Sequence, residues 1–251
     1  MVVYKIVVLS IIYYSKNISI MSVKQIIRNA FPRGVKALYR EYWGNGNAKK
    51  YHVNEGKVQI QLPNSVYPNN VNIENYVRIQ DHVRLIAGKG SLVIKKYSAI
   101  GSGTVIIPGT HIPTVGLPQY LSYLGINDIN VTLVIEEDCW IGAECMLLNK
   151  CHIGRGAVVG ARSVVTKAIP PYAVVTGTPA KIIAVRFSID QIMRHEQMLY
   201  PATERFSRKK LEEIFTTHYS NMRVIGTDEL RDEDFERLRI EKERISMSDF
   251  K

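Results

Sequence analysis

The sequence has few cysteines, and its N-terminal apolar run is too short to cross a membrane. That run, IVVLSIIYY, lies between Lys5 and Lys16, whereas a membrane span needs ~20 apolar residues. No small-residue cleavage site follows it, as a secretory signal peptide would require. Translation could begin at Met1 or at Met21, which follows directly. We expect no stable membrane insertion, with a membrane-surface anchor as the alternative.

The three cysteines recur every six residues, at Cys139, Cys145 and Cys151. They occupy the small-residue position of a repeat whose stacked strands recur every 18 residues, so they lie on different sides of the coil. This arrangement indicates a packing role and argues against a disulfide or a metal site. Unpaired thiols fit a reducing compartment, so we expect a cytoplasmic protein.

The charge is basic but uneven. The formal net charge is +10, distributed as +8 over residues 1–60, +4 over 61–187 and −2 over 188–251. Such a body suits an anionic ligand. The repeats lack the aromatic platforms and the basic stripe of a nucleic-acid groove, so we expect no nucleic-acid partner.

A six-residue period organises the centre of the chain, from Leu133 to Lys167. Branched aliphatic residues recur at one position, and small residues stand two before each of them. The aliphatic column is Ile135, Ile141, Leu147, Ile153, Val159 and Val165, and the small column is Cys139, Cys145, Cys151, Ala157 and Ser163. A fixed period of this kind predicts stacked turns around a shared core. Three short strands per coil give a mainly β fold, a parallel β-helix.

We count twelve hexads, all in the middle of the chain. They predict a β-helix domain over residues 61–187, preceded by an N-terminal extension with a helical segment (1–60) and followed by a C-terminal helical tail (188–251). The phase slips by three residues at Ala87–Gly90. A larger break expels a loop at 112–132, and such loops are usually functional. In the tail, Ser188 with Gln191 predicts a capping box, and Ser207 predicts a second helix start.

The residue between the two inward columns must point outward. In the first hexads it is Asn72, Arg78 and Arg84, and later it is Val93, Ala99 and Val105, then Trp140, Met146, His152, Val158 and Val164. A flat apolar face is unfavourable in water at ~25 cal/mol per Å². The pattern therefore predicts a subunit interface and a cyclic homotrimer.

His111 has the same outward phase and opens the expelled loop. An outward histidine is usually a solvated residue, but a position beside such a loop and at a subunit cleft favours general-base chemistry. His152 shares the phase without the loop, which favours an interface role.

The chain resembles the hexapeptide-repeat O-acyltransferases over roughly Val71 to Phe187. The segments that carry the resemblance are LVIKKYSAIGSGTVIIPGTH, CWIGAECML and GRGAVVGARSVVTKAIPPYAVVTGTPAKIIAVRF. It implies a left-handed parallel β-helix, a homotrimer, and acetyl transfer from acetyl-coenzyme A to a hydroxyl without a metal. In that family the histidine that closes the first segment is the catalytic base, which implies this role for His111.

The resemblance also implies a coenzyme A groove between two subunits. The implied contacts are Gly142, Ala143, Gly160, Ala161, Thr166, Lys167, Lys181 and Arg186. The expelled loop would shape the acceptor site through Leu117, Tyr120 and Tyr123. The chain departs from the family pattern at Lys95 and Arg162, where glycine is usual, and Arg162 could add a phosphate contact.

Several alternatives stay open. The favoured acceptor is a sugar of a surface polysaccharide or its precursor, and the alternative is an antibiotic of the chloramphenicol or streptogramin type. A zinc enzyme of the γ-carbonic anhydrase kind would need three converging histidines, but His111 has no histidine within ten residues. A non-catalytic assembly module is the alternative of another class.

Overall fold

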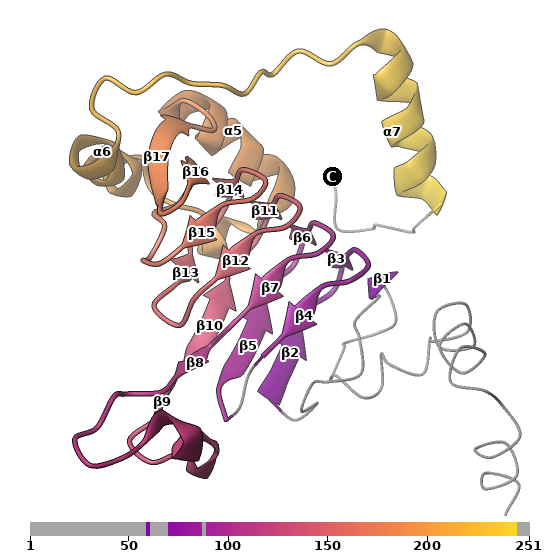
Figure 1. Ribbon diagram of the computed structural model, residues 1–251. Helices are drawn as coiled ribbons and strands as arrows, with labels where there is room; N and C mark the ends of the chain where they lie inside the picture. Colours follow the sequence, from indigo (N-terminus) through magenta and orange to yellow (C-terminus); the bar gives the residue numbers. More distant parts are fainter. Residues whose placement is uncertain (1–58, 61–69, 87–88, 245–251) are drawn as a thin grey trace, which may run out of the picture. The chain divides into compact units, whose positions relative to one another are not determined.

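We describe a computed structural model of the chain over residues 59–60, 70–86 and 89–244 (Figure 1). The expected N-terminal extension, with its helical segment and its two candidate start sites, lies outside these residues except for β1. That strand pairs in parallel with β3, with Gln59 beside Arg78. Two residues on the N-terminal side of the expected boundary of the β-helix domain thus take part in strand pairing.

Three sheets, parallel except for the last strand of sheet A, form the three sides of the coil (Figure 1). Sheet A holds β1 (Gln59–Ile60), β3 (Arg78–Ile79), β6 (Ala99–Ile100), β11 (Trp140–Ile141), β14 (Val158–Val159), β16 (Ala173–Gly177) and β17 (Ala180–Val185). Sheet B holds β2 (Val71–Ile73), β5 (Ser91–Ile94), β10 (Thr132–Ile135) and β13 (His152–Ile153). Sheet C holds β4 (Arg84–Leu85), β7 (Val105–Ile106), β12 (Met146–Leu147) and β15 (Val164–Val165).

The register is the one that the hexads predict. Trp140 pairs with Val158 and Met146 with Val164, each 18 residues apart on its own side. Both inward columns of the central stretch are buried, and no member of either column is more than 4% exposed. The three cysteines are free and buried, and burial raises the pKa of the Cys151 thiol to about 11. The cysteines are therefore neutral packing residues on three different sides, as expected.

The two interruptions of the hexads appear as changes of register. Asn72 pairs with Val93, so the first coil is three residues longer than the later ones, which is the expected phase slip. Val93 pairs with Val134, which leaves 23 residues more than one coil between them. The loop is closed at its base by antiparallel pairing of β8 (Gly109–Thr110) with β9 (Ile129–Asn130), and it carries the 3₁₀ helix η3 (Gln119–Leu124).

The C-terminal segment lies at one end of the coil. β16 and β17 form an antiparallel hairpin, and α5 (Ile189–Leu199) and α6 (Arg208–His218) bury Ile192, Leu211 and Ile214 in the same core as the coil. The Ser188–Gln191 capping box and the Ser207 cap are present as predicted. The other helices are η4 (Ala202–Glu204) and α7 (Asp232–Arg244).

The expected outward column does point outward. Trp140 is 61% exposed and Met146 37%, although both are large and apolar. Val105 is the exception at 8%, since Arg84 and Met146 flank it in register on sheet C. No helix in the described part of the chain is long and apolar enough to span a bilayer.

Candidate functional site

The turns between the sheets stack into three edges of the prism, which we name by what they carry. The loop edge joins sheet C to sheet B and includes 107–111, 148–151 and 166–168. The glycine edge joins sheet A to sheet C at 101–104, 142–145 and 160–163. The helix edge joins sheet B to sheet A at 74–77, 95–98, 136–139 and 154–157, and the segment after α5 lies against it.

His111 lies on the loop edge directly after β8. Thr110 pairs with Ile129, so continuing the antiparallel register places position 111 opposite position 128. The structure confirms this geometry, since His111 Nδ1 lies 2.8 Å from Asp128 Oδ1. The His111 side chain is 55% exposed and that of Asp128 only 18%. The base of the expelled loop thus holds an accessible histidine against a largely buried carboxylate.

This contact fixes which ring nitrogen of His111 carries the hydrogen when the imidazole is neutral. A carboxylate only accepts hydrogen bonds, so Nδ1 must carry the hydrogen that points at Asp128. In the neutral ring, Nε2 then keeps its lone pair. A base needs a free lone pair, here at Nε2, to remove a proton from a substrate hydroxyl. His111 is thus arranged as a base that Asp128 orients.

Asp128 was not among the residues singled out from the sequence. Its 17-residue separation from His111 is set by the length of the loop and by the β8–β9 register. Neither follows from the hexad period, because the loop lies outside the repeat. An acidic residue just before the chain re-enters the coil was the available signal.

The loop presents apolar side chains to solvent. No residue of η3 is buried, and Tyr120 and Tyr123 are 86% and 73% exposed, with their rings edge to face at 6.4 Å. Leu117, the third expected acceptor residue, is half-buried just before η3. An Asn127 to Thr114 hydrogen bond of 3.1 Å braces the loop. The loop therefore carries an exposed apolar surface around Tyr120 and Tyr123.

Gly142 and Gly160 lie on the glycine edge with Ala143 and Ala161. A Cβ on Gly142 would meet the backbone nitrogen of Ala161 at 2.5 Å, so coil stacking requires glycine there. Ala143 and Ala161 are exposed. The glycine edge therefore presents a row of backbone and methyl groups at positions 142–143 and 160–161, which we call the glycine rail. A long, flexible ligand could lie along it.

Basic residues surround the C-terminal end of this rail. Arg162 is exposed beside Ala161, and Lys181 is exposed on β17 opposite Thr176, whose side chain lies over Gly160. Within the described part of the chain, Arg162 makes an ion pair with Glu144 at 3.2 Å, with both side chains largely exposed. A row of small exposed residues with basic side chains at one end suits a ligand that has an extended arm and phosphate groups.

Thr166 and Lys167 lie on the loop edge, since β15 is two coils beyond β7 on sheet C. His111 therefore shares an edge with Thr166 and Lys167, whereas Gly142 and Gly160 lie on the neighbouring edge. Equivalent positions on neighbouring edges are six residues apart along the coil, which at ~3.3 Å per residue is at most about 20 Å. The expected site residues thus form two groups on one chain.

Arg186 has a different surrounding. Its guanidinium holds Asp138 on the helix edge, with Nη1 at 2.7 Å from Oδ2, and His195 contacts the same carboxylate oxygen at 2.9 Å. Its side chain is only 21% exposed. Arg186 fastens the segment before α5 to the coil. Lys95, where glycine is usual, is similarly engaged by Glu136 at 2.5 Å.

Arg162 also occupies a strained backbone position, with φ of +60°. In this conformation a residue with a Cβ makes the folded state ~1–2 kcal/mol less stable than glycine does. The exposed ion pair between Arg162 and Glu144 adds little to stability. Arg162→Gly is therefore expected to raise the free energy of unfolding by about 1 kcal/mol. Chemical denaturation measures it, with Arg84→Gly, an exposed strand position, as a control that should lose stability. A lower stability of Arg162→Gly would contradict the strain argument.

The glycine rail and its hexads match a known family. The family described as bacterial transferase hexapeptide (six repeats) covers residues 132–167. A probable macrolide acetyltransferase from Lysinibacillus sphaericus is 33% identical over an alignment 130 residues long that covers 47% of this chain and 71% of that protein. The chain belongs to the hexapeptide-repeat transferases. Its coil is therefore the left-handed parallel β-helix expected from the sequence.

Other hexapeptide-repeat relatives cover shorter stretches. A chloramphenicol acetyltransferase from Agrobacterium fabrum is 36% identical over 42% of this chain and 56% of its own length. One from Klebsiella aerogenes is 52% identical over 24% and 28%. The chain thus spans between about a quarter and just over half of the length of these chloramphenicol acetyltransferases.

Solved structures of hexapeptide-repeat and related acyltransferases are also similar. A hexapeptide-repeat acetyltransferase from Vibrio cholerae, complexed with acetyl-coenzyme A, is 23% identical with a TM-score of 0.47, covering 64% of this chain and 82% of that one. An N-acyltransferase from Bacillus cereus, in complex with dTDP and 3-hydroxybutyryl-CoA, is 21% identical with a TM-score of 0.41, covering 50% and 66%. Residues 70–86 and 89–244 contain no group of three His, Cys, Asp or Glu side chains arranged to hold a metal ion.

Proposed function

We propose that this protein is an acetyltransferase that moves an acetyl group from acetyl-coenzyme A to a hydroxyl. The observation that carries the proposal is the pairing of His111 with Asp128 at the base of the expelled loop. It supplies an oriented base on an accessible edge of a transferase coil. The names of the relatives, chloramphenicol and macrolide acetyltransferases, support acyl transfer.

The chemistry needs one base and one oxyanion contact. His111 Nε2 removes the proton from the acceptor hydroxyl as its oxygen bonds to the thioester carbonyl carbon. The C–S bond then breaks, and the proton on His111 passes to the sulfur that leaves. A backbone N–H from the facing coil would stabilise the oxyanion. Acetyl-coenzyme A supplies the activated acyl group, so no metal is required in this scheme.

The glycine edge is our proposed coenzyme A rail. Backbone groups at Gly142–Ala143 and Gly160–Ala161 would hold the pantetheine arm, and Lys167, Lys181 and Arg162 would approach the phosphates. Thr166 would contact it from the loop edge. These positions fit because their side chains are small or cationic and, apart from the glycines and Thr166, exposed.

We further propose that the working unit is a homotrimer. Trp140 and Met146 leave an apolar surface on sheets A and C, and the loop leaves more around Tyr120 and Tyr123. His111 and the glycine rail lie on different edges, so a neighbouring copy could bring a second rail to each His111. The proposal places the protein in the cytoplasm, where its three thiols stay reduced.

For the acceptor, we propose a sugar hydroxyl of a surface polysaccharide or its precursor. The exposed rings of Tyr120 and Tyr123 provide flat apolar surfaces for a pyranose ring. A second candidate is an antibiotic hydroxyl, because the relatives carry the names of chloramphenicol and macrolide acetyltransferases. Both acceptors would use the same base.

A screen of acceptors tests the proposal. Purified protein with acetyl-coenzyme A is offered nucleotide sugars, neutral oligosaccharides, chloramphenicol and a macrolide, and thiol release is followed. Transfer to a sugar supports the favoured acceptor, and transfer to a drug alone supports the second. Absence of coenzyme A binding by calorimetry would favour a non-catalytic assembly module and overturn the proposal.

Asp128 is expected to be a positioning residue. Asp128→Asn should lower kcat by about tenfold or more, since an amide can present its N–H to Nδ1 and favour the wrong tautomer. KM for acetyl-coenzyme A should stay unchanged, and Asp128→Glu should recover part of kcat. Asp81→Asn is the matched control, because Asp81 contacts His82 Nδ1 at 2.9 Å away from the loop. Equal kcat in the Asp128→Asn and parental proteins would contradict this role.

A further inference from the structure

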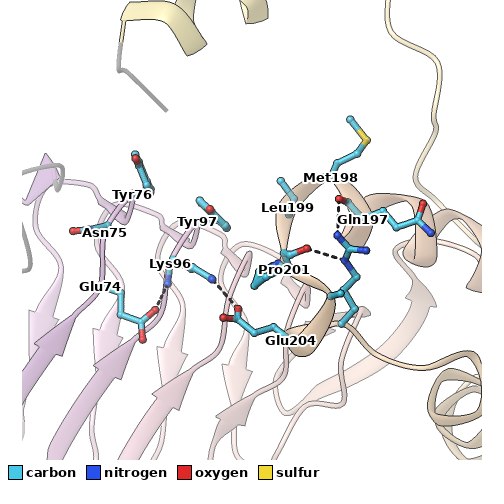
Figure 2. Close-up of a pocket in the computed structure, with 13 residues that line it drawn as sticks. Glu74, Asn75, Tyr76, Lys96, Tyr97, Gln197, Met198, Leu199, Pro201 and Glu204 are labelled. Atoms are coloured by element: carbon cyan, nitrogen blue, oxygen red, sulfur yellow. Dashed lines mark hydrogen bonds and ion pairs between the residues drawn. The ribbon is translucent and has the colours of Figure 1, made fainter. Parts of the chain in front are cut away.

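A separate pocket of about 780 Å³ lies between the helix edge and the segment that follows α5 (Figure 2). This volume falls within the ~300–1,000 Å³ of small-molecule sites. One wall comes from the turns of two successive coils, with Tyr76 and Tyr97, and the other from the last turn of α5, starting at Gln197, and the residues after it up to Arg205. Neither His111 nor the glycine rail belongs to it.

Two tyrosines form an aromatic platform in this pocket. Tyr76 and Tyr97 stand one coil apart in the same turn position, with ring centroids 5.7 Å apart and planes 24° from parallel. Figure 2 shows both side chains rising from the coil beside each other. The Tyr97 ring also lies 6.1 Å from that of Tyr200 on the opposite wall. The platform thus continues from one wall to the other.

The two tyrosines lie in a turn conformation that recurs along the coil. Tyr76 and Tyr97 have φ of +59° and +69°, a conformation that bulky L-residues rarely adopt. The same turn position holds Asp138, Gly156 and the buried Tyr172 in later coils, at φ of +55°, +71° and +64°. The positive φ therefore belongs to the turn itself, and glycine fits it without strain.

Two residues of this pocket carry a buried polar atom without a partner. Tyr200 is 3% exposed, and its hydroxyl has no hydrogen bond in the part of the chain that the structure describes. The Asn75 side-chain oxygen is also buried there without a partner. Both atoms are closed off from solvent and lie beneath the pocket wall, so the polar groups that a ligand meets are exposed ones such as the Gln197 amide.

The charges around the pocket cancel. Lys96 Nζ bonds Glu204 at 2.9 Å, and Glu74 accepts the backbone N–H of Lys96 at 2.9 Å. The Lys96 ammonium also lies 5.4 Å from the centre of the Tyr200 ring. Arg205 is held by the Tyr200 carbonyl at 2.8 Å. A phosphate or a carboxylate would find these cations already engaged, which favours a neutral ligand.

We propose that this pocket binds a neutral saccharide unit. A pyranose ring offers an apolar face to the tyrosine platform and hydroxyl groups to the exposed Gln197 amide on the opposite wall. The proposal concerns binding and does not depend on acetyl transfer.

Binding is tested with maltotetraose, cellotetraose and tetra-N-acetylchitotetraose by saturation-transfer NMR and titration of the full chain. We expect at least one probe to bind. Tyr97→Gly suits the positive φ and should keep the fold, while binding weakens about tenfold through loss of the ring. Gln197→Ala removes an exposed amide of the pocket wall, so binding should weaken about threefold to tenfold with no loss of thermal stability.

Phe235→Ala, on α7, is the matched control, because this exposed ring lies outside the pocket lining, and it should leave this binding unchanged. Three outcomes would overturn the proposal. One is that none of the three probes binds. Another is that binding survives both Tyr97→Gly and Gln197→Ala at the parental affinity. The third is that indole or p-nitrophenol occupies the pocket and the saccharides do not displace it. Failure of acetyl transfer in the acceptor screen would not bear on this result.

Discussion

Replacing His111 by alanine is expected to lower acetyl-transfer turnover by ~10²-fold or more. The imidazole at the base of the loop is the one group near the proposed acceptor that Asp128 orients for proton removal. Because the side chain is exposed and outside the core, the fold and the affinity for acetyl-coenzyme A should be nearly unchanged. The loss should therefore appear in kcat. Steady-state kinetics with thiol release measure it.

His152→Ala is the matched control. His152 is outward and 52% exposed like His111, and it also contacts a carboxylate, with Nε2 3.1 Å from Glu136 Oε1. It lies on the flat face of sheet B, away from the loop. This variant should keep most of the activity. Parental turnover in His111→Ala together with a loss in His152→Ala would mean that the active site is placed wrongly.

Val158→Asp is expected to dissociate the proposed trimer. Val158 lies beside Trp140 on the outward face of sheet A, where the apolar column would be buried between subunits. An unpaired charge buried in an interface costs roughly 3–5 kcal/mol. Light scattering on dilute protein should show trimers for the parent and smaller species for the variant.

Arg78→Asp controls for the mere introduction of an acidic residue. Arg78 is exposed on the same sheet, in the first coil, where the outward column is polar. It should leave the mass unchanged. A parental protein that is monomeric at micromolar concentration would contradict the interface altogether.

Most of the coil could be predicted from the sequence because its buried positions recur with a fixed period. Each inward position repeats every six residues, so a column such as Ile135 to Val165 identifies the core without knowledge of distant contacts. The helix starts at Ser188 and Ser207 were also predictable, since capping is local. The phase slip before Ser91 was readable for the same reason.

The parts that escaped prediction depend on contacts between segments far apart in the chain. Asp128 reaches His111 through a hairpin whose register lies outside the repeat. The bond between Arg186 and Asp138 joins residues 48 positions apart in the chain. The tyrosine pocket exists only because the segment after α5 lies against turns more than 100 residues away. None of these pairings has a sequence period.

The central claim is that His111 and the coenzyme A rail form a site shared between subunits, and mixed trimers test it directly. His111→Ala removes the base, and Ala161→Trp places a bulky ring on the exposed rail. Each variant alone should be inactive as a trimer. After unfolding and refolding together in equal amounts, the mixture should recover about a quarter of the parental rate, the chance that neighbours in a random cyclic trimer supply complementary intact halves. A mixture that forms trimers but stays as inactive as either variant alone would contradict the shared site.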